Sequence, residues 1–217
     1  KTILVGPNEA GKTAILQALQ KLNPPKETTL FNPLRDYPRS KYDEDISSKG
    51  VNMDNFTVVE GHFSLSEAEK EEIPEGFKEL IYVYGRYLNN NTWHRLDNVP
   101  ERATYSTIEK DLLRIQAHID KNYRKEESID PSELTPVQSE LNEQTQKIKP
   151  NSIISVDIAN ALEAWLNKYI AYISEGSEDE KRYDMLKQVF ESVAGRALVL
   201  EKCRSLLPTF VLFNNYF

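Results

Sequence analysis

The chain has one cysteine, three histidines and no apolar run near the ~20 residues needed to cross a bilayer. The single Cys203 cannot form a disulfide within the chain, which is typical of a protein from a reducing, cytoplasmic compartment. Cys203 falls in a helical pattern, so we expect a packed thiol there. His62 and His94 lack a second His or Cys at ligand spacing, so we expect no metal site on these histidines. Because no apolar run is long enough to cross a bilayer, we expect no membrane partner.

An excess of positive charge is also missing. The net charge is −7, from 27 basic and 34 acidic residues, which argues against a surface made for general nucleic-acid binding. Acidic clusters at 43–45, 67–75 and 175–180 are expected to be solvated surface. The 217 residues, 39% of them hydrophobic, suffice for one large globular domain or two small ones.

The sequence opens on a phosphate-binding pattern. Gly6-Pro7-Asn8-Glu9-Ala10-Gly11-Lys12-Thr13 reads G-x-x-x-x-G-K-T. Before it, the apolar run Thr2-Ile3-Leu4-Val5 predicts a buried strand. After it, apolar residues at helical spacing predict a helix from Lys12 to Leu22, ended by residues 23–25; they are Ile15, Leu16, Ala18, Leu19 and Leu22.

Strand, loop and helix together predict a site for ATP and Mg²⁺. Gly6 and Gly11 allow backbone angles that turn consecutive N–H groups toward phosphate oxygens, and the helix N-terminus adds positive potential. Lys12 is expected to reach the β- and γ-phosphates, which makes it the candidate catalytic residue, and the Thr13 hydroxyl is the candidate Mg²⁺ ligand. Pro7, Asn8, Glu9 and Ala10 are expected to contribute mainly backbone.

The wording of this loop resembles the phosphate loops of ABC-type ATPases of the SMC/RecF/RecN superfamily. It is most similar to the ATPase domains of OLD-family (overcoming lysogenization defect) nucleases and related defence ATPases. Two further stretches resemble that family: Tyr37-Pro38-Arg39, and Pro208-Thr209-Phe210-Val211-Leu212-Phe213, where the family has a strand that re-enters the ATPase sheet. The resemblance implies an α/β P-loop NTPase fold, dimerisation of two heads around ATP, and action on DNA in repair or phage defence.

An ATPase of this kind also needs a strand that ends in a Mg²⁺-organising Asp, usually beside an acidic base. The only candidate is Ile153-Ile154-Ser155-Val156-Asp157. The pattern becomes helical from that point, so we expect Ser155 to be a helix N-cap and Asp157 to lie in the first turn. Both chain ends interrupt apolar runs, and we expect a fragment whose catalytic acidic residues lie elsewhere.

Between the loop and the final apolar run, the pattern predicts three parts. Residues 31–39, with two prolines, are expected to be a loop with Arg35 and Arg39 at its surface. The alternative is that one of them approaches a phosphate or a carboxylate, and the resemblance favours Arg39 for this. Runs at 56–65, 79–88 and 92–96 predict an antiparallel β lobe, with a capping box at Ser66. From Ser106 to Leu207 apolar stripes predict a helical insertion, with His118 at the surface and a bend at Gly195.

These parts give an expected organisation of 1–103 for the P-loop unit and β lobe, 104–207 for the helical insertion and 208–217 for a strand returning to the ATPase core. Three functions are compatible with the sequence. The first is the ABC-type ATPase head acting on DNA. The others are a P-loop small-molecule kinase, and a scaffold in which nucleotide controls association without hydrolysis.

Overall fold

The computed structural model shows a mixed α/β protein. The structure describes residues 4–7, 11–48, 50–52 and 54–213. Its contacts divide the chain into two units. The sheet unit comprises Lys1–Glu72, Lys78–Val99 and Glu201–Phe217, and the helical unit comprises Ile73–Phe77 and Pro100–Leu200. Among the helices of the described ranges, none combines the length and the apolar character needed to span a bilayer.

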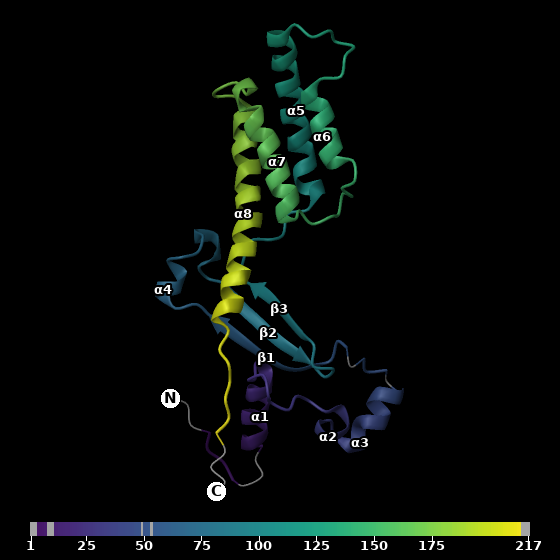
Figure 1. Ribbon diagram of the computed structural model, residues 1–217, viewed down its shortest axis with the longest axis vertical. Helices are drawn as coiled ribbons and strands as arrows, with labels where there is room; N and C mark the ends of the chain where they lie inside the picture. Colours follow the sequence, from purple (N-terminus) through teal and green to yellow (C-terminus); the bar gives the residue numbers. More distant parts are fainter. Residues whose placement is uncertain (1–3, 8–10, 49, 53, 214–217) are drawn as a thin grey trace. The chain divides into compact units, whose positions relative to one another are not determined.

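The sheet unit is built on a three-stranded antiparallel meander (Figure 1). Its strands are β1 (Thr57–Ser64), β2 (Ile81–Tyr87) and β3 (Thr92–Asp97), in the order β1-β2-β3. The three predicted strands are confirmed to within a few residues. Asn90 turns the chain between β2 and β3 at φ 73°, a left-handed angle that asparagine tolerates better than most residues.

The sheet unit also contains short helices. They are α1 (Lys12–Leu22), α2 (Pro33–Asp36), α3 (Arg39–Tyr42), the π-helical turn η1 (Asp43–Ser48) and α4 (Glu67–Lys70). The bounds predicted for α1 are confirmed. The capping box is confirmed too, because the Glu69 carboxylate accepts from the N–H and the hydroxyl of Ser66, both at 2.7 Å. The loop predicted for 31–39 is wrong in part: Asn32 caps α2 by accepting from the N–H of Leu34, and Pro33 occupies its first position.

Both strands predicted at the edges of the sequence are wrong where the structure describes them. Leu4 and Val5 belong to no strand, and Val5 is 90% exposed; Thr2 and Ile3 lie outside the described residues. Residues 208–213 form no strand either, and Phe213 is 85% exposed. A strand exists only through its hydrogen bonds to a neighbouring strand. Residues 208–213 bond instead to the end of α1: the N–H of Phe210 donates to the Asn23 carbonyl at 2.9 Å, and the Asn23 side chain donates to the Pro208 carbonyl at 3.0 Å.

The helical unit contains α5 (Tyr105–Glu127), α6 (Pro136–Thr145), α7 (Val156–Lys168), and α8 (Glu178–Leu206) as far as Leu200 (Figure 1). Two single turns, η2 (Glu75–Phe77) and η3 (Ile170–Tyr172), complete it. The predicted apolar stripes are confirmed as its core, which includes Ile108, Leu112, Ile115, Ile119, Val137, Leu141, Leu162, Trp165, Leu166, Leu186 and Phe190.

Two details of these helices differ from the prediction. α5 begins at Tyr105 with Thr104 as N-cap, ahead of the predicted Ser106, because Thr104 also forms a β-bridge with Ile153 that fixes the entry of the chain. α8 continues without a break through Gly195. A Cβ on Gly195 would lie 3.1 Å from the Phe77 ring, so this glycine permits close packing inside the helical unit.

Candidate nucleotide-binding site

The predicted phosphate loop leads directly into α1. Gly11 is the N-cap of the helix at φ 80°, an angle in the left-handed region where glycine carries no Cβ penalty. Lys12 is the first helical residue and Thr13 the second, and the N–H of Ile15 donates to the Gly11 carbonyl at 3.1 Å. Gly6 and Pro7 are described and exposed, whereas Asn8, Glu9 and Ala10 lie outside the described residues.

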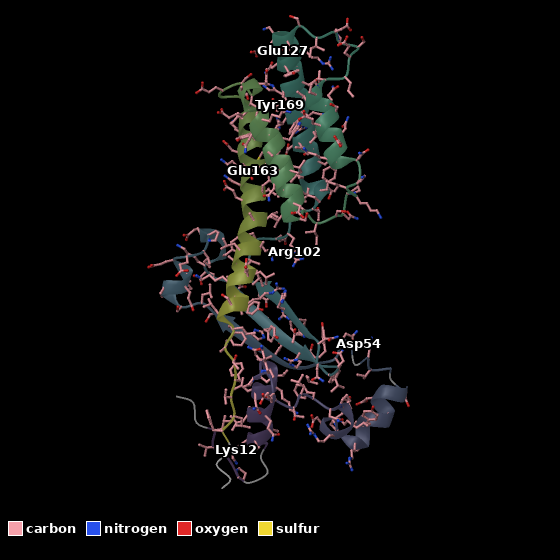
Figure 2. The ribbon with its side chains drawn as sticks, in the orientation of Figure 1. Lys12, Asp54, Arg102, Glu127, Glu163 and Tyr169 are labelled. Atoms are coloured by element: carbon pink, nitrogen blue, oxygen red, sulfur yellow. The ribbon has the colours of Figure 1, made fainter. Side chains whose placement is uncertain are left out.

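The Lys12 ammonium turns back over the loop. Its Nζ donates to the carbonyl oxygens of Gly6 at 2.7 Å and Pro7 at 2.5 Å, and Figure 2 labels this side chain at the N-terminal end of α1. The first turn of α1 contains no acidic residue, so the free N–H groups and the helix dipole add to the lysine charge. These described residues fit an anionic phosphate group, with the Thr13 hydroxyl as the available Mg²⁺ ligand.

The other end of α1 is fixed to the sheet. Leu22 is buried, and one of its methyl carbons would lie 2.7 Å from a Cβ on Gly61 of β1. Arg86 of β2 donates from Nε and Nη2 to the Leu22 carbonyl, at 3.4 and 3.2 Å, and from Nη1 to the Asn90 carbonyl at 2.6 Å. Arg86 is buried, and its positive charge at the C-terminus of α1 complements the helix dipole.

The remaining apolar side of α1 is exposed. Ile15, Leu16 and Leu19, predicted as a packing stripe, each leave at least 41% of their surface accessible. A helix that shows apolar residues on one side normally buries that side against another element. The sequence pattern therefore predicted the helix correctly but not the exposure of this side.

Arg35 and Arg39 lie in different surroundings. The Arg35 guanidinium bonds the neighbouring Asp36 carboxylate at 2.7 and 3.0 Å, and Lys21 of α1 contacts the same carboxylate at 2.8 Å. The hydrogen bonds from Arg35 hold the pKa of Asp36 well below its usual range. Arg35 thus approaches a carboxylate, as one of the two predicted alternatives has it, and Arg39 is the first residue of α3.

The acidic candidate Asp157 lies in a helix. The Ser155 hydroxyl accepts from the N–H of Ile158 at 3.3 Å, and Asp157 occupies the first turn of α7. The predicted N-cap is confirmed. No group of three or more His, Cys, Asp or Glu side chains suited to a metal ion occurs within the described ranges.

The sequence analysis did not predict one polar cluster in the helical unit. His118, predicted at the surface, is half-buried: its Nδ1 lies 3.1 Å from Asp179 Oδ2, and its Nε2 lies 3.2 Å from Ser174 Oγ. This order matches the carboxylate, imidazole and hydroxyl of a hydrolase triad. The Ser174 N–H, however, also donates to Nε2 at 3.2 Å, whereas in a triad the serine N–H faces the substrate oxyanion. His118 therefore holds the segment before α8 against α5.

A scan against protein-family models, a search of curated proteins and a search of solved structures each find no match to this chain.

Proposed function

We propose that this chain is the ATP-binding part of an ABC-type ATPase head that couples ATP binding and hydrolysis to DNA processing in repair or phage defence. The amino-acid sequence of the loop from Gly6 to Thr13 is the observation that carries the proposal. The start of α1 at Lys12, directly after a left-handed Gly11, supports it. The resemblance to OLD-family ATPases supplies the proposed P-loop NTPase fold, the homodimer of heads and the link to DNA.

In this proposal Lys12 exchanges one set of oxygen partners for another. In the structure its ammonium donates to the carbonyls of Gly6 and Pro7. When Mg-ATP binds, phosphate oxygens take the ammonium, and charge-assisted bonds to phosphate are stronger than bonds to neutral carbonyls. Thr13 would ligate Mg²⁺, which supplies charge neutralisation at the β- and γ-phosphates.

The exposed side of α1 agrees with the same assignment. In a P-loop ATPase this side of the helix packs against the central sheet that also contains the strand before the loop. Ile15, Leu16 and Leu19 offer such a surface. The central sheet that would cover them is part of the proposal.

A titration with a fluorescent Mg-ATP analogue tests the proposal. We expect saturable binding by the natural sequence, loss of binding in Lys12→Ala, and unchanged binding in Lys21→Ala. Lys21 is a matched control because it lies on the same helix and pairs with Asp36. Equal affinity of the Lys12→Ala and natural proteins would reject the phosphate-loop assignment, provided circular dichroism shows both to be folded.

The helical position of Asp157 favours a second candidate function, a scaffold in which nucleotide controls association. Fast turnover would exclude the scaffold, whereas slow turnover fits both candidates. An ATPase at work in this chain would reach rates near ~1 s⁻¹, within the usual enzyme range. We expect much slower turnover from this chain alone, and ATP-dependent dimerisation measured by sedimentation would then show whether binding by itself drives assembly.

A further inference from the structure

Arg196 is a half-buried arginine of α8 whose guanidinium has no described carboxylate beside it. Its Nη2 donates a hydrogen bond to the carbonyl of Pro100, in the segment that leads into α5. Other arginines of the chain contact a carboxylate at 2.9 Å or less: Arg35, Arg95, Arg124 and Arg182. Arg196 thus differs from them, because a neutral carbonyl is the group that holds it.

A second arginine lies close to the first. Arg102, labelled in Figure 2, follows Pro100 by two residues, so its Cα lies within about 7 Å of the Cα of Pro100. Burial, and then the charge of Arg102, lower the pKa of Arg196, which shows that the two guanidiniums repel each other. The Arg102 side chain is exposed, and no hydrogen bond or ion pair joins it to a described residue.

The backbone that carries the two arginines is fixed by bonds of its own. The Ala103 carbonyl accepts from the N–H of Ile154, and the N–H of Tyr105 donates to the Ser152 carbonyl, both at 2.9 Å. On α8, Gly195 packs so closely that a Cβ there would lie 3.1 Å from a phenyl carbon of η2. All of these residues belong to the helical unit. Two like charges are therefore held near each other by contacts that the guanidiniums do not make.

The start of α5 adds to the positive potential at this place. Its first turn contains no acidic residue to offset the helix dipole. The N–H groups of Tyr105 and Ser106 donate to carbonyls of residues 150–152, so a ligand would meet guanidinium N–H groups and not these. Glu101 is exposed and bonds neither guanidinium. The arrangement is thus one that an added anion would stabilise.

We propose that Arg102 and Arg196 together bind one phosphate monoester group. Each guanidinium presents a planar fork of N–H donors that matches phosphate oxygens. A phosphate monoester carries a charge of about −1.5 to −2 near neutral pH, so it neutralises both arginines, whereas a phosphodiester or a carboxylate neutralises one. Binding also removes the repulsion within the pair. The site is separate from the phosphate loop and does not rest on the proposed function.

An NMR titration at constant ionic strength tests the site, with phenyl phosphate as the monoester probe and dimethyl phosphate as the diester probe. We expect phenyl phosphate to shift the Nε–Hε signals of Arg102 and Arg196 saturably, with a dissociation constant on the order of 1 mM, and dimethyl phosphate to bind more weakly. Arg102→Gln should weaken phenyl phosphate about tenfold. Arg102→Lys should weaken it less, because lysine keeps the charge and loses the planar fork. Both variants should fold normally, since the Arg102 side chain has no described partner.

Two controls separate this site from other sources of binding. Arg114→Gln removes a half-exposed arginine of the same unit, which contacts Asp111 at 3.8 Å, and should leave the affinity unchanged. Lys12→Ala removes the charge at the phosphate loop and should leave the shifts of both arginine signals unchanged. Shifts that stay linear up to about 20 mM phenyl phosphate would overturn the proposal, because they would mean that the arginines are only solvated. Equal affinities for the two probes, or for Arg102→Gln and the natural protein, would overturn it as well.

Discussion

The guanidinium of Arg86 donates two hydrogen bonds to the carbonyl of Leu22, the last residue of α1. That carbonyl is one of the four at a helix C-terminus that lack a partner within the helix. The strand side chain therefore completes the helix that begins at the phosphate loop. It also makes β2 the element that sets where the last turn of α1 lies in the sheet unit.

Replacement of Arg86 by alanine should destabilise the sheet unit. The change leaves the Leu22 carbonyl without its donor and empties the space of a buried side chain, so we expect a loss of about 2–3 kcal/mol in the free energy of unfolding. Urea denaturation followed by circular dichroism measures it. Arg95→Ala is the control: the Arg95 side chain is half exposed, bonds Asp97 and lies over the Trp93 ring, so its loss should stay at about 1 kcal/mol. Equal losses in the two variants would contradict a structural role for Arg86.

Gly85→Ala tests the packing across β2 and β3. Gly85 is the register partner of Trp93, and a methyl group on Gly85 would overlap the indole ring. The ring must then move off the strand, which we expect to cost about 1–3 kcal/mol of stability and to change the tryptophan emission. A thermal melt followed by fluorescence reads both effects.

Gly76→Ala provides the comparison. A Cβ on Gly76 would meet its nearest neighbour, Pro100, at 3.6 Å, an ordinary contact. This variant should melt close to the natural protein. If Gly85→Ala melts as Gly76→Ala does, the indole does not lie over Gly85.

Asp120→Ala should weaken the helical unit. The buried Asp120 carboxylate accepts from Arg124 Nε at 2.8 Å, from Gln138 Nε2 at 3.1 Å and from the Thr135 hydroxyl. Its removal leaves a largely buried guanidinium without its counter-charge, which costs about 3 kcal/mol or more. Asp111→Ala serves as control, since Asp111 contacts arginines only at 3.5 and 3.8 Å; a comparable loss there would show that the Asp120 network is not special.

Stability should fall at alkaline pH through Cys203. Burial raises the pKa of this thiol, so above the ordinary thiol value of about 8.5 the folded state holds a proton that the unfolded state has released. With fewer protons on the unfolded chain, the free energy of unfolding decreases as the pH rises. Cys203→Ser should show a smaller decrease in melting temperature between about pH 7.5 and about pH 9.5, below the range where tyrosines titrate. Parallel curves for the two proteins would place the alkaline loss elsewhere.

Hydrophobic periodicity correctly predicted the helices and strands whose packing partners lie within the described residues. The stripe from Ile108 to Ile119 needs only the neighbouring helices, and the strand at 57–64 needs only β2. The same reasoning failed for Leu4-Val5 and for 208–213, because apolar residues in sequence do not reveal whether a neighbouring strand is present to pair with them.

At the candidate site the sequence predicted the phosphate loop and the bounds of α1. It did not predict the contacts of Arg86 that hold the last turn of α1 against the sheet. Arg86 lies in the strand predicted at 79–88, and its contacts with Leu22 and Asn90 are recognisable only once the sheet is folded. Asn32-Pro33, a cap followed by proline at the first helical position, is a local signal for α2 that the predicted loop at 31–39 does not include.

Each unit contains one of the two tryptophans, Trp93 on β3 over Gly85 and Trp165 in α7, where its Nε1 donates to the Val137 carbonyl at 3.2 Å. The protein thus provides two native optical probes. Replacing either indole by phenylalanine leaves an emission signal from one unit only. Denaturation of the two single-tryptophan proteins would show whether the units unfold in one cooperative step or in two.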